Sequence, residues 1–284
     1  MYYIENEFLK AGFEAHGAEL RSLVNKTTGE EYMWCGDPAF WGRVSPVLFP
    51  VVGNYKDKKS LYKGREYSLS QHGFARDSEF EVAASGAESI AFKLESDEKL
   101  KEVYPFDFRL VIEYNLIDKK LEVKWRVENL DEERMHFSIG GHPAFNLRDN
   151  DSVIKFYGVK SFTAGILDSG LLSERTKEIE LDENGILKPT KELFMEDALV
   201  IEKSNIKKVS LADKSGSEYL TVEFDTPVLG IWSPAGKEAP FVCIEPWFGR
   251  TDRTDFNCRL EEREYGNTLE KGGVFEASYF IETY

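Results

Sequence analysis

The amino-acid sequence predicts an all-β protein, a sandwich or barrel of mostly antiparallel strands with very little helix. Apolar and charged residues alternate with a period of two between 121 and 128, which places one face of a strand in a core and the other in water. Similar β-prone runs recur along the chain, separated by Gly, Asn, Asp and Pro. Helical periodicity is scarce. Strands in this number are typical of a sandwich or a barrel.

The clearest element is a hairpin at 108–129, interrupted by Asp-Lys-Lys at 118–120. In its second half four apolar residues alternate with charged ones: Leu121, Val123, Trp125 and Val127. Further strands are expected at 2–6, 89–95, 153–157, 219–224, 241–245 and 274–282.

The segments between the strands offer little else. After Pro189, residues 190–195 predict a helical turn or two. We interpret the acidic runs 95–102 and 131–133 as solvated loops rather than binding sites. The chain has no internal repeat, low-complexity segment or Ser/Gly-rich linker in which a boundary could lie. We therefore expect a single domain spanning 1–284.

Composition narrows the classes of partner. The 284 residues are 42% hydrophobic, and 36 Lys and Arg face 51 Asp and Glu, a formal charge of -15. Such a surface repels phosphate backbones and anionic headgroups, so we expect no nucleic acid and no membrane as partner. The N-terminus lacks a basic region before an apolar run, and no stretch approaches the roughly 20 apolar residues of a membrane span. We expect a cytoplasmic protein.

The cysteines carry no motif. Cys35, Cys243 and Cys258 are odd in number and widely spaced, which favours neither a disulfide framework nor a zinc site. Each is expected to pack as a small apolar side chain. Of the four histidines, His16 and His136 are expected at ordinary strand positions.

The other two histidines stand in unusual segments. His72 lies in Gln-His-Gly-Phe-Ala-Arg-Asp at 71–77, and His142 lies in Gly-Gly-His-Pro-Ala-Phe-Asn at 140–146. Glycine beside histidine lets the backbone bend and lets a ligand approach closely. The alternative interpretation is that each histidine is an ordinary turn residue.

A third segment, 241–250, contains Glu245 at the end of an apolar strand. The period of two places this carboxylate on the same face as Phe241 and Cys243. Desolvation there raises a carboxyl pKa from roughly 4.3 toward neutrality, as a general base requires. The alternative is a strand-end glutamate paired with Arg250 or Arg253.

Other charged residues allow two interpretations. Arg43 and Arg76 are either surface cations or, beside aromatic residues and glycine, the rim of a sugar pocket. Asp252, Asp255 and Asn257 match no calcium loop and are interpreted as a polar loop. The usual nucleotide, metalloprotease and serine-hydrolase motifs are absent from the sequence.

Taken together, four blocks of the chain resemble the aldose 1-epimerase family, and most of all its bacterial LacX-like branch. They are 34–53, His-Gly-Phe-Ala-Arg at 72–76, 140–146 and Glu-Pro-Trp at 245–247, and they occur in order along essentially the whole chain. The resemblance implies a galactose mutarotase-like β-supersandwich and a reaction at the anomeric carbon of an aldose. The His-Gly motif is shorter than that of galactose-specific mutarotases, so galactose itself is not implied.

Roles carried over by motif make Glu245 the general base and His142 the general acid. The resemblance implies further sugar contacts from His72, Arg43, Arg76 and Asp197. It implies no cofactor and no metal. The expected partner is a small-molecule aldose or aldose phosphate, with the protein a monomer or weak homodimer.

The mechanism that follows moves only protons. Ionised Glu245 takes the proton of the anomeric hydroxyl while protonated His142 gives one to the ring oxygen, and the mutual attraction of the two charges is expected to favour that state. Three alternatives remain: a hexose-6-phosphate 1-epimerase using Arg43 and Arg76, a non-catalytic sugar-binding module, and a glycoside hydrolase or lyase with Asp197 as second carboxylate.

Overall fold

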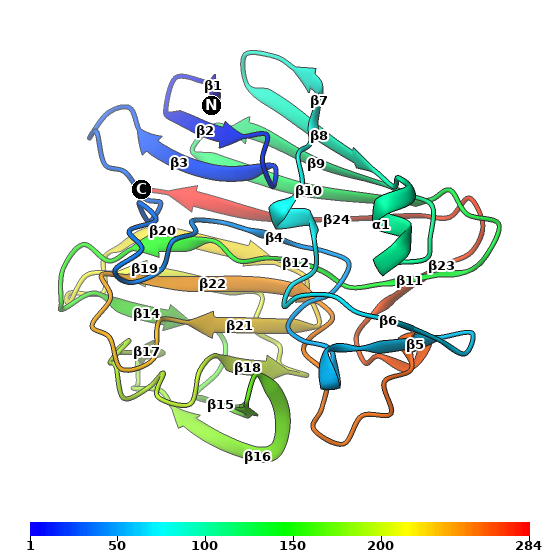
Figure 1. The fold of residues 1–284 in the computed structure, drawn as a ribbon. Helices are drawn as coiled ribbons and strands as arrows, with labels where there is room; N and C mark the ends of the chain where they lie inside the picture. The colour runs from blue at the N-terminus through cyan, green and yellow to red at the C-terminus, as the bar shows by residue number, and fades with distance from the viewer.

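Two large sheets dominate the computed structural model, which describes residues 1–284 (Figure 1). The chain forms 24 strands, and every pairing between them in these sheets is antiparallel. The all-β, mostly antiparallel architecture predicted from the sequence is confirmed.

The nine-stranded sheet is built around the predicted hairpin. Its order is β17 (Ile186–Leu187), β14 (Val153–Phe156), β19 (Lys208–Ala212), β20 (Glu218–Phe224), β24 (Val274–Thr283), β10 (Lys120–Asn129), β9 (Phe108–Ile117), β8 (Ser89–Glu95) and β7 (Glu81–Ser85). Side chains of β9 and β10 alternate between buried and partly exposed along their length, as the period of two predicts.

The eight-stranded sheet carries the functional segments. Its order is β16 (Leu171–Glu180), β15 (Ser161–Asp168), β18 (Leu199–Glu202), β21 (Val228–Trp232), β22 (Phe241–Phe248), β12 (Ile139–Gly141) and β4 (Val47–Leu48), with β13 (Ala144–Asn146) also paired to β22. Each strand predicted from the sequence is present, with ends that differ by at most three residues.

Three smaller sheets complete the fold. They are β1 (Tyr2–Glu5), β2 (Leu9–Glu14) and β3 (Glu19–Asn25); β5 (Ser60–Tyr62) and β6 (Arg65–Tyr67); and β11 (Met135–Phe137) with β23 (Asn267–Leu269). The first of them packs on the nine-stranded sheet through Phe13, whose ring lies 4.4 Å from that of Tyr114.

The main core uses only one face of β22. Val242 and Ile244 join a cluster of 55 buried residues that draws on both large sheets. Cys243 points to the other face, into a separate aromatic cluster with Trp34 and Phe241. One face of β22 therefore stabilises the sheet packing, and the opposite face is left for the site.

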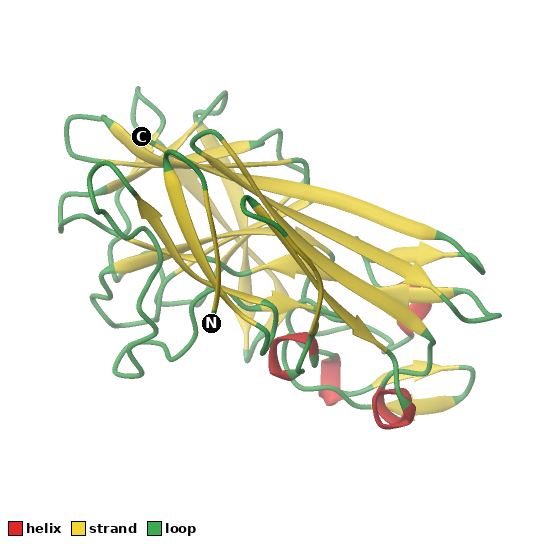
Figure 2. Cartoon of the chain, turned by 90° about the horizontal axis from the view of Figure 1, so that it is seen from above, coloured by secondary structure: helices red, strands yellow, loops and turns green.

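Helix is sparse, and two expectations about it were wrong. The acidic run at 95–102 is not all loop: Asp97 accepts a hydrogen bond from the Leu100 amide and caps helix α1 (Glu98–Val103). Residues 190–195 form successive turns rather than a helix. The few helical turns gather on one side of the molecule (Figure 2). None of the helices has the length and apolarity needed to cross a bilayer.

Candidate active site

Strand register brings the two proposed catalytic residues together. β12 pairs with β22 at Gly140, and β13 pairs with β22 at Ala144, in the same register. His142 and Pro143 lie between these two strands, and the Ile244 amide still donates to the Pro143 carbonyl at 3.3 Å, so the register is unshifted and His142 lies opposite Glu245. Nε2 of His142 is 3.4 Å from Oε2 of Glu245, and both side chains are buried. A cross-strand pair in a buried sheet is therefore the centre of the site.

The pair lies at a cavity of about 260 Å³. Sixteen residues line it, namely Trp41, Val52, Gly53, Gln71, His72, Arg76, His142, Leu167, Gly170, Asp197, Ala198, Val200, Trp232, Glu245, Trp247 and Thr251. Pockets for drug-sized ligands span roughly 300–1,000 Å³, so this cavity suits a single sugar ring.

His72 reaches the cavity from a tight backbone turn. Both His72 and Gly73 have positive φ, and a Cβ at Gly73 would lie 2.2 Å from the carbonyl oxygen of Phe49. Only glycine permits that approach. Nδ1 of His72 accepts a hydrogen bond from the Gly53 amide at 3.1 Å, so the neutral ring carries its proton on Nε2. Burial lowers the pKa of His72 well below its usual value, which keeps the ring a neutral hydrogen-bond donor.

Three tryptophans form the aromatic walls. Trp41 stacks on the imidazole of His142 with ring centres 4.7 Å apart, and Trp232 meets the same imidazole edge-on at 5.4 Å. Trp247 lies over Gly230, where a Cβ would come within 2.5 Å of the indole. These contacts exclude water from His142 and give the cavity flat apolar surfaces.

Burial sets the protonation of the pair. Desolvation, with a smaller contribution from the charge of Asp197, raises the pKa of Glu245 well above 4.5. Desolvation, with the nearby guanidinium charges, lowers the pKa of His142 to about 3. The expected rise in the pKa of Glu245 is confirmed. With its pKa lowered to about 3, the His142 imidazole is neutral at pH 7, so the two shifts favour a neutral pair over the charged pair expected from the sequence.

Two arginines lie beside this neutral pair. Arg76 lines the cavity, and its buried Nε has no hydrogen-bond partner in the protein. Burial and the charge of Arg43 lower the pKa of Arg76 to about 10. Arg43 is not a lining residue; its guanidinium pairs with Asp77 at 2.8 Å. The side of the cavity that holds Arg76 therefore offers cationic donors to a bound ligand.

Comparison with known proteins shows the family of the chain. The family model described as aldose 1-epimerase matches residues 1–277. The chain belongs to the aldose 1-epimerase family. The plasmid-encoded protein LacX of Lactococcus lactis subsp. lactis is 30% identical over 282 residues, covering 94% of this chain and 91% of LacX.

Solved structures of two relatives show the same fold. A galactose mutarotase related enzyme from Lactobacillus acidophilus has a TM-score of 0.94 and 36% identity, over 100% of this chain and 97% of that one. A galactose mutarotase-like protein from Lactobacillus casei has a TM-score of 0.91 and 31% identity, over the full length of both chains. The galactose mutarotase-like fold predicted from the sequence is confirmed.

The structure places five of the six proposed site residues around one cavity, and Arg43 just outside it. The alternative partners for Glu245 are wrong. Arg250 pairs with Glu202 and Glu264, and Arg253 lies 3.3 Å from Asp255. Glu245 Oε2 has no hydrogen-bond partner in the protein, so its carboxyl is free to meet a ligand.

Expectations for the remaining polar residues had mixed outcomes. Asp252 is buried in an ion pair with Arg263 at 2.7 Å, a structural role rather than an exposed loop position. His136 lies in β11 as expected. His16 instead lies in the turn after β2, where it is exposed and forms only an isolated bridge. Cys243 and Cys258 are buried as expected, but Cys35 is exposed.

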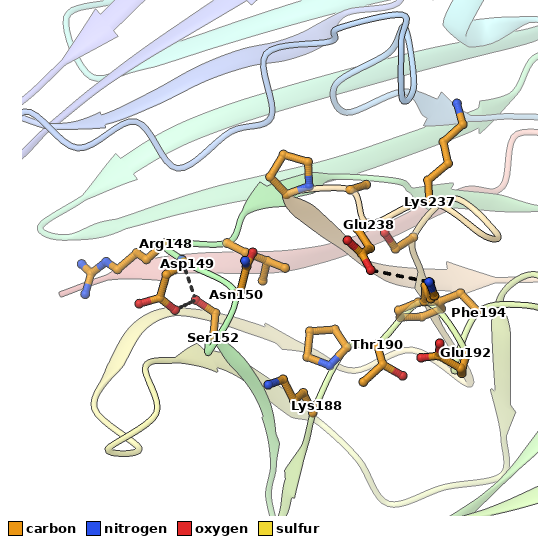
Figure 3. Close-up of a pocket in the computed structure, with 16 residues that line it drawn as sticks. Arg148, Asp149, Asn150, Ser152, Lys188, Thr190, Glu192, Phe194, Lys237 and Glu238 are labelled. Atoms are coloured by element: carbon orange, nitrogen blue, oxygen red, sulfur yellow. Dashed lines mark hydrogen bonds and ion pairs between the residues drawn. The ribbon is translucent and has the colours of Figure 1, made fainter.

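A second cavity, of about 540 Å³, is lined mainly by polar and charged residues, several of which already have partners in the protein. Lys191 and Glu238 lie 3.6 Å apart, and Ser152 donates to Asp149 at 3.2 Å. Figure 3 shows Arg148 pointing away from the other lining side chains, and it pairs with Glu30. This cavity brings no acid and base together, so we do not assign the reaction to it.

The tryptophans are the main cavity-lining residues that the sequence analysis did not propose for the site. Trp41 and Trp247 stand inside motifs that carried the family resemblance, and their proximity to those motifs was a usable indication. Trp232 stands in no such motif. It reaches the site because it pairs with Cys243 across β21 and β22, two residues along from Glu245.

Proposed function

We propose that the protein is a cofactor-independent aldose 1-epimerase that interconverts the α and β anomers of an aldose. The observation that carries the proposal is the buried pair of His142 and Glu245, 3.4 Å apart at a cavity suited to one sugar ring. Membership of the aldose 1-epimerase family supports the same reaction. An acid and a base at one position are what ring opening of a cyclic hemiacetal requires.

The proposed reaction opens and recloses the sugar ring. Glu245 takes the proton from the anomeric hydroxyl, and His142 Nε2 gives a proton to the ring oxygen. The bond between C1 and the ring oxygen breaks as the C1 carbonyl forms. Rotation about the C1-C2 bond turns the aldehyde, and the ring closes on its other face with both proton transfers reversed. His72 and Asp197 are proposed to hold sugar hydroxyls during the rotation, which keeps the open chain in place.

One proton is shared by the pair throughout the cycle. Ring opening converts ionised Glu245 and protonated His142 into the neutral pair, which is also the form that burial favours. The charged form is needed only while the closed ring is bound. We propose that sugar hydroxyls donating to the unpartnered Oε2 of Glu245 stabilise that carboxylate and move the proton to His142.

NMR exchange between anomers tests the proposal. We expect catalytic amounts of the protein to accelerate exchange for at least one member of a panel of glucose, galactose and their 6-phosphates. The matched binding experiment is a calorimetric titration with the same sugars. Saturable binding without any acceleration would contradict the proposal and support a sugar-binding module instead.

A hexose 6-phosphate is the second candidate substrate class. The buried Nε of Arg76 favours it: this nitrogen lies 3.7 Å from the carboxylate of Asp77 but has no hydrogen-bond partner in the protein, and a hydrogen bond between a guanidinium and a phosphate is charge-assisted. Removing such a bond typically costs about 1.5–3 kcal/mol. We therefore expect Arg76→Met to weaken binding of glucose 6-phosphate by roughly 10- to 150-fold, with a smaller effect on glucose. Equal effects on the two sugars would exclude a phosphate contact at Arg76.

A glycoside hydrolase or lyase needs a second carboxylate beside Glu245. Asp197 is exposed at the cavity, and its charge contributes to the raised pKa of Glu245. We propose that Asp197 contacts sugar hydroxyls rather than the reacting bond, because the acid-base partner of Glu245 is already present in His142. Release of reducing ends from an oligosaccharide by the wild-type protein would overturn this assignment.

A further inference from the structure

Cys243 is buried beside the proposed proton-transfer pair, and the mechanism above does not use it. Its side chain lies on the same face of β22 as Glu245, two residues earlier. One ligand atom from each of His142, Cys243 and Glu245 lies within 4.8 Å of the others. All three residues are buried.

These three side chains supply the donor atoms of a zinc site. Imidazole nitrogen, thiolate sulfur and carboxylate oxygen bind Zn²⁺ at about 2.0–2.3 Å, which sets tetrahedral ligand atoms roughly 3.3–3.8 Å apart. Nε2 of His142 and Oε2 of Glu245 already have that spacing at 3.4 Å. Since no donor distance exceeds 4.8 Å and a tetrahedral sulfur lies about 3.5 Å from its fellow ligands, the thiol needs a movement of at most about 1.3 Å.

The electrostatics of the site suit a divalent cation once two protons have left. A thiolate and a carboxylate neutralise the two charges of the ion, so the complex would be electrically neutral in a buried position. Oε2 of Glu245 has no hydrogen-bond partner in the protein and is open to a new one. His142 and Glu245 both line the cavity, which provides an entry path and room for a water molecule as fourth ligand.

We propose that His142, Cys243 and Glu245 form an inhibitory site for a thiophilic divalent cation such as Zn²⁺. Binding releases two protons to solvent, one from the Cys243 thiol and the one shared by His142 and Glu245, so it tightens as the pH rises. The bound ion occupies Nε2 of His142 and the carboxylate of Glu245, which blocks both proton transfers. Arg43 and Arg76, whose charges reach His142, oppose the cation, so the ion is an inhibitor rather than a resident cofactor.

Metal binding is tested first, without any sugar. After treatment with a chelator, the protein is titrated with Zn²⁺ by calorimetry and with Co²⁺ by absorption spectroscopy. We expect one ion per chain at this site and a thiolate-to-cobalt charge-transfer band. Replacing a residue that only supports a zinc ligand costs about 10- to 100-fold in metal affinity. Cys243→Ser removes a ligand itself, so we expect it to weaken Zn²⁺ binding by at least about 100-fold and to abolish the thiolate-to-cobalt band.

Cys258→Ser is the matched control, because Cys258 is also a buried free thiol but does not belong to the donor cluster. We expect it to bind Zn²⁺ like the wild type. Equal affinity in Cys243→Ser and the wild type, or a wild-type Co²⁺ adduct without a thiolate band, would overturn the site. The second result needs no variant and stands even if Cys243→Ser fails to fold.

The inhibitory effect rests on the proposed epimerase function and is tested separately. We expect the chelated wild type to accelerate anomer exchange, Zn²⁺ to abolish the acceleration, and Cys243→Ser to stay active at the same Zn²⁺ concentration. Full activity of the Zn²⁺-saturated wild type would overturn inhibition. A chelated wild type that binds Zn²⁺ through Cys243 but never accelerates exchange would contradict the epimerase function and leave the metal site standing.

Discussion

Replacement of Glu245 by Gln tests the proton pair directly, because it keeps the side-chain shape and removes one of the two proton sites. The protein lowers the pKa of His142 from 6.5 to about 3, which opposes an isolated imidazolium by roughly 5 kcal/mol. Without a proton from Glu245, only about one His142 in 10⁴ is protonated at pH 7. General acid-base catalysis contributes about 10²- to 10⁴-fold. We therefore expect Glu245→Gln to lose acceleration by a factor in that range, toward its upper end.

The assay is NMR exchange between anomers at saturating sugar, with binding measured in parallel by calorimetry. Gln retains hydrogen-bonding groups at the same position, so we expect the affinity for sugar to change by only a few-fold. Glu196→Gln is the matched control: Glu196 precedes Asp197 in the chain, is exposed, and pairs with Arg175 at 2.9 Å rather than lining the cavity. We expect it to retain wild-type exchange rates.

Three results would refute this reasoning. A fully active Glu245→Gln variant would show that the carboxyl is not a proton-transfer group. An equal loss in Glu245→Gln and Glu196→Gln would show that the effect comes from the overall charge near the cavity. A loss confined to binding, with the rate at saturation unchanged, would make Glu245 a sugar contact and not a base.

Three further predictions use the same cavity. Activity needs one proton on the pair of His142 and Glu245, so the pH profile of the rate should be bell-shaped. The acidic limb should lie near pH 3, where the pair takes up a second proton at His142, and the alkaline limb should lie at the raised pKa of Glu245. An acidic limb near the ordinary histidine pKa would contradict burial as the cause of the shift. The raised pKa also links stability to pH. The folded chain keeps the Glu245 proton, whereas the unfolded chain releases it above roughly pH 4.3. Glu245 therefore contributes stability at low pH that is lost as the pH rises through its folded pKa. Melting temperatures should therefore fall less between pH 4 and pH 8 in Glu245→Gln than in the wild type, and parallel curves would argue against the shift. Gly230→Ala should push Trp247 into the cavity, because the new Cβ would lie 2.5 Å from the indole. We expect it to lower the free energy of unfolding by about 1–3 kcal/mol and to weaken sugar binding. The control Gly86→Ala, in the turn before β8, should leave sugar binding unchanged.

Local pattern was enough to predict the strands but not their neighbours. The hairpin at 108–129 follows from alternation alone, because its two strands are adjacent in sequence and its core face repeats every second residue. The pairing of β24 between β10 and β20 joins segments far apart in the chain, and no local pattern encodes it. Helix α1 was missed because a six-residue helix is too short to show periodicity and is marked only by its cap at Asp97.

The candidate site likewise has residues that the sequence could locate and an arrangement that it could not predict. Motifs located Glu245, His142 and His72, and the period of two placed Glu245 on the correct face of its strand. What the sequence could not provide was the unshifted register across Pro143, which sets His142 opposite Glu245. The same limitation hid Trp232, which reaches the cavity only through pairing with β22. The charge state was expected from the two side chains alone, whereas burial by residues elsewhere in the chain, such as Trp41 and Trp232, shifts both pKa values toward the neutral pair.

The aromatic walls of the cavity affect the proposed reaction because they bury the proton-transfer pair. A solvated Glu and His at 3.4 Å would exist as an ion pair, with the proton held on the imidazole. The stacked Trp41 and the edge of Trp232 remove that solvent, which favours the proton on Glu245. In the proposed reaction, a sugar that donates hydroxyls to the carboxylate would be both the substrate and the group that moves the proton to His142. Substitutions in the aromatic walls should accordingly change the rate through the proton position, even where they leave His142 and Glu245 untouched.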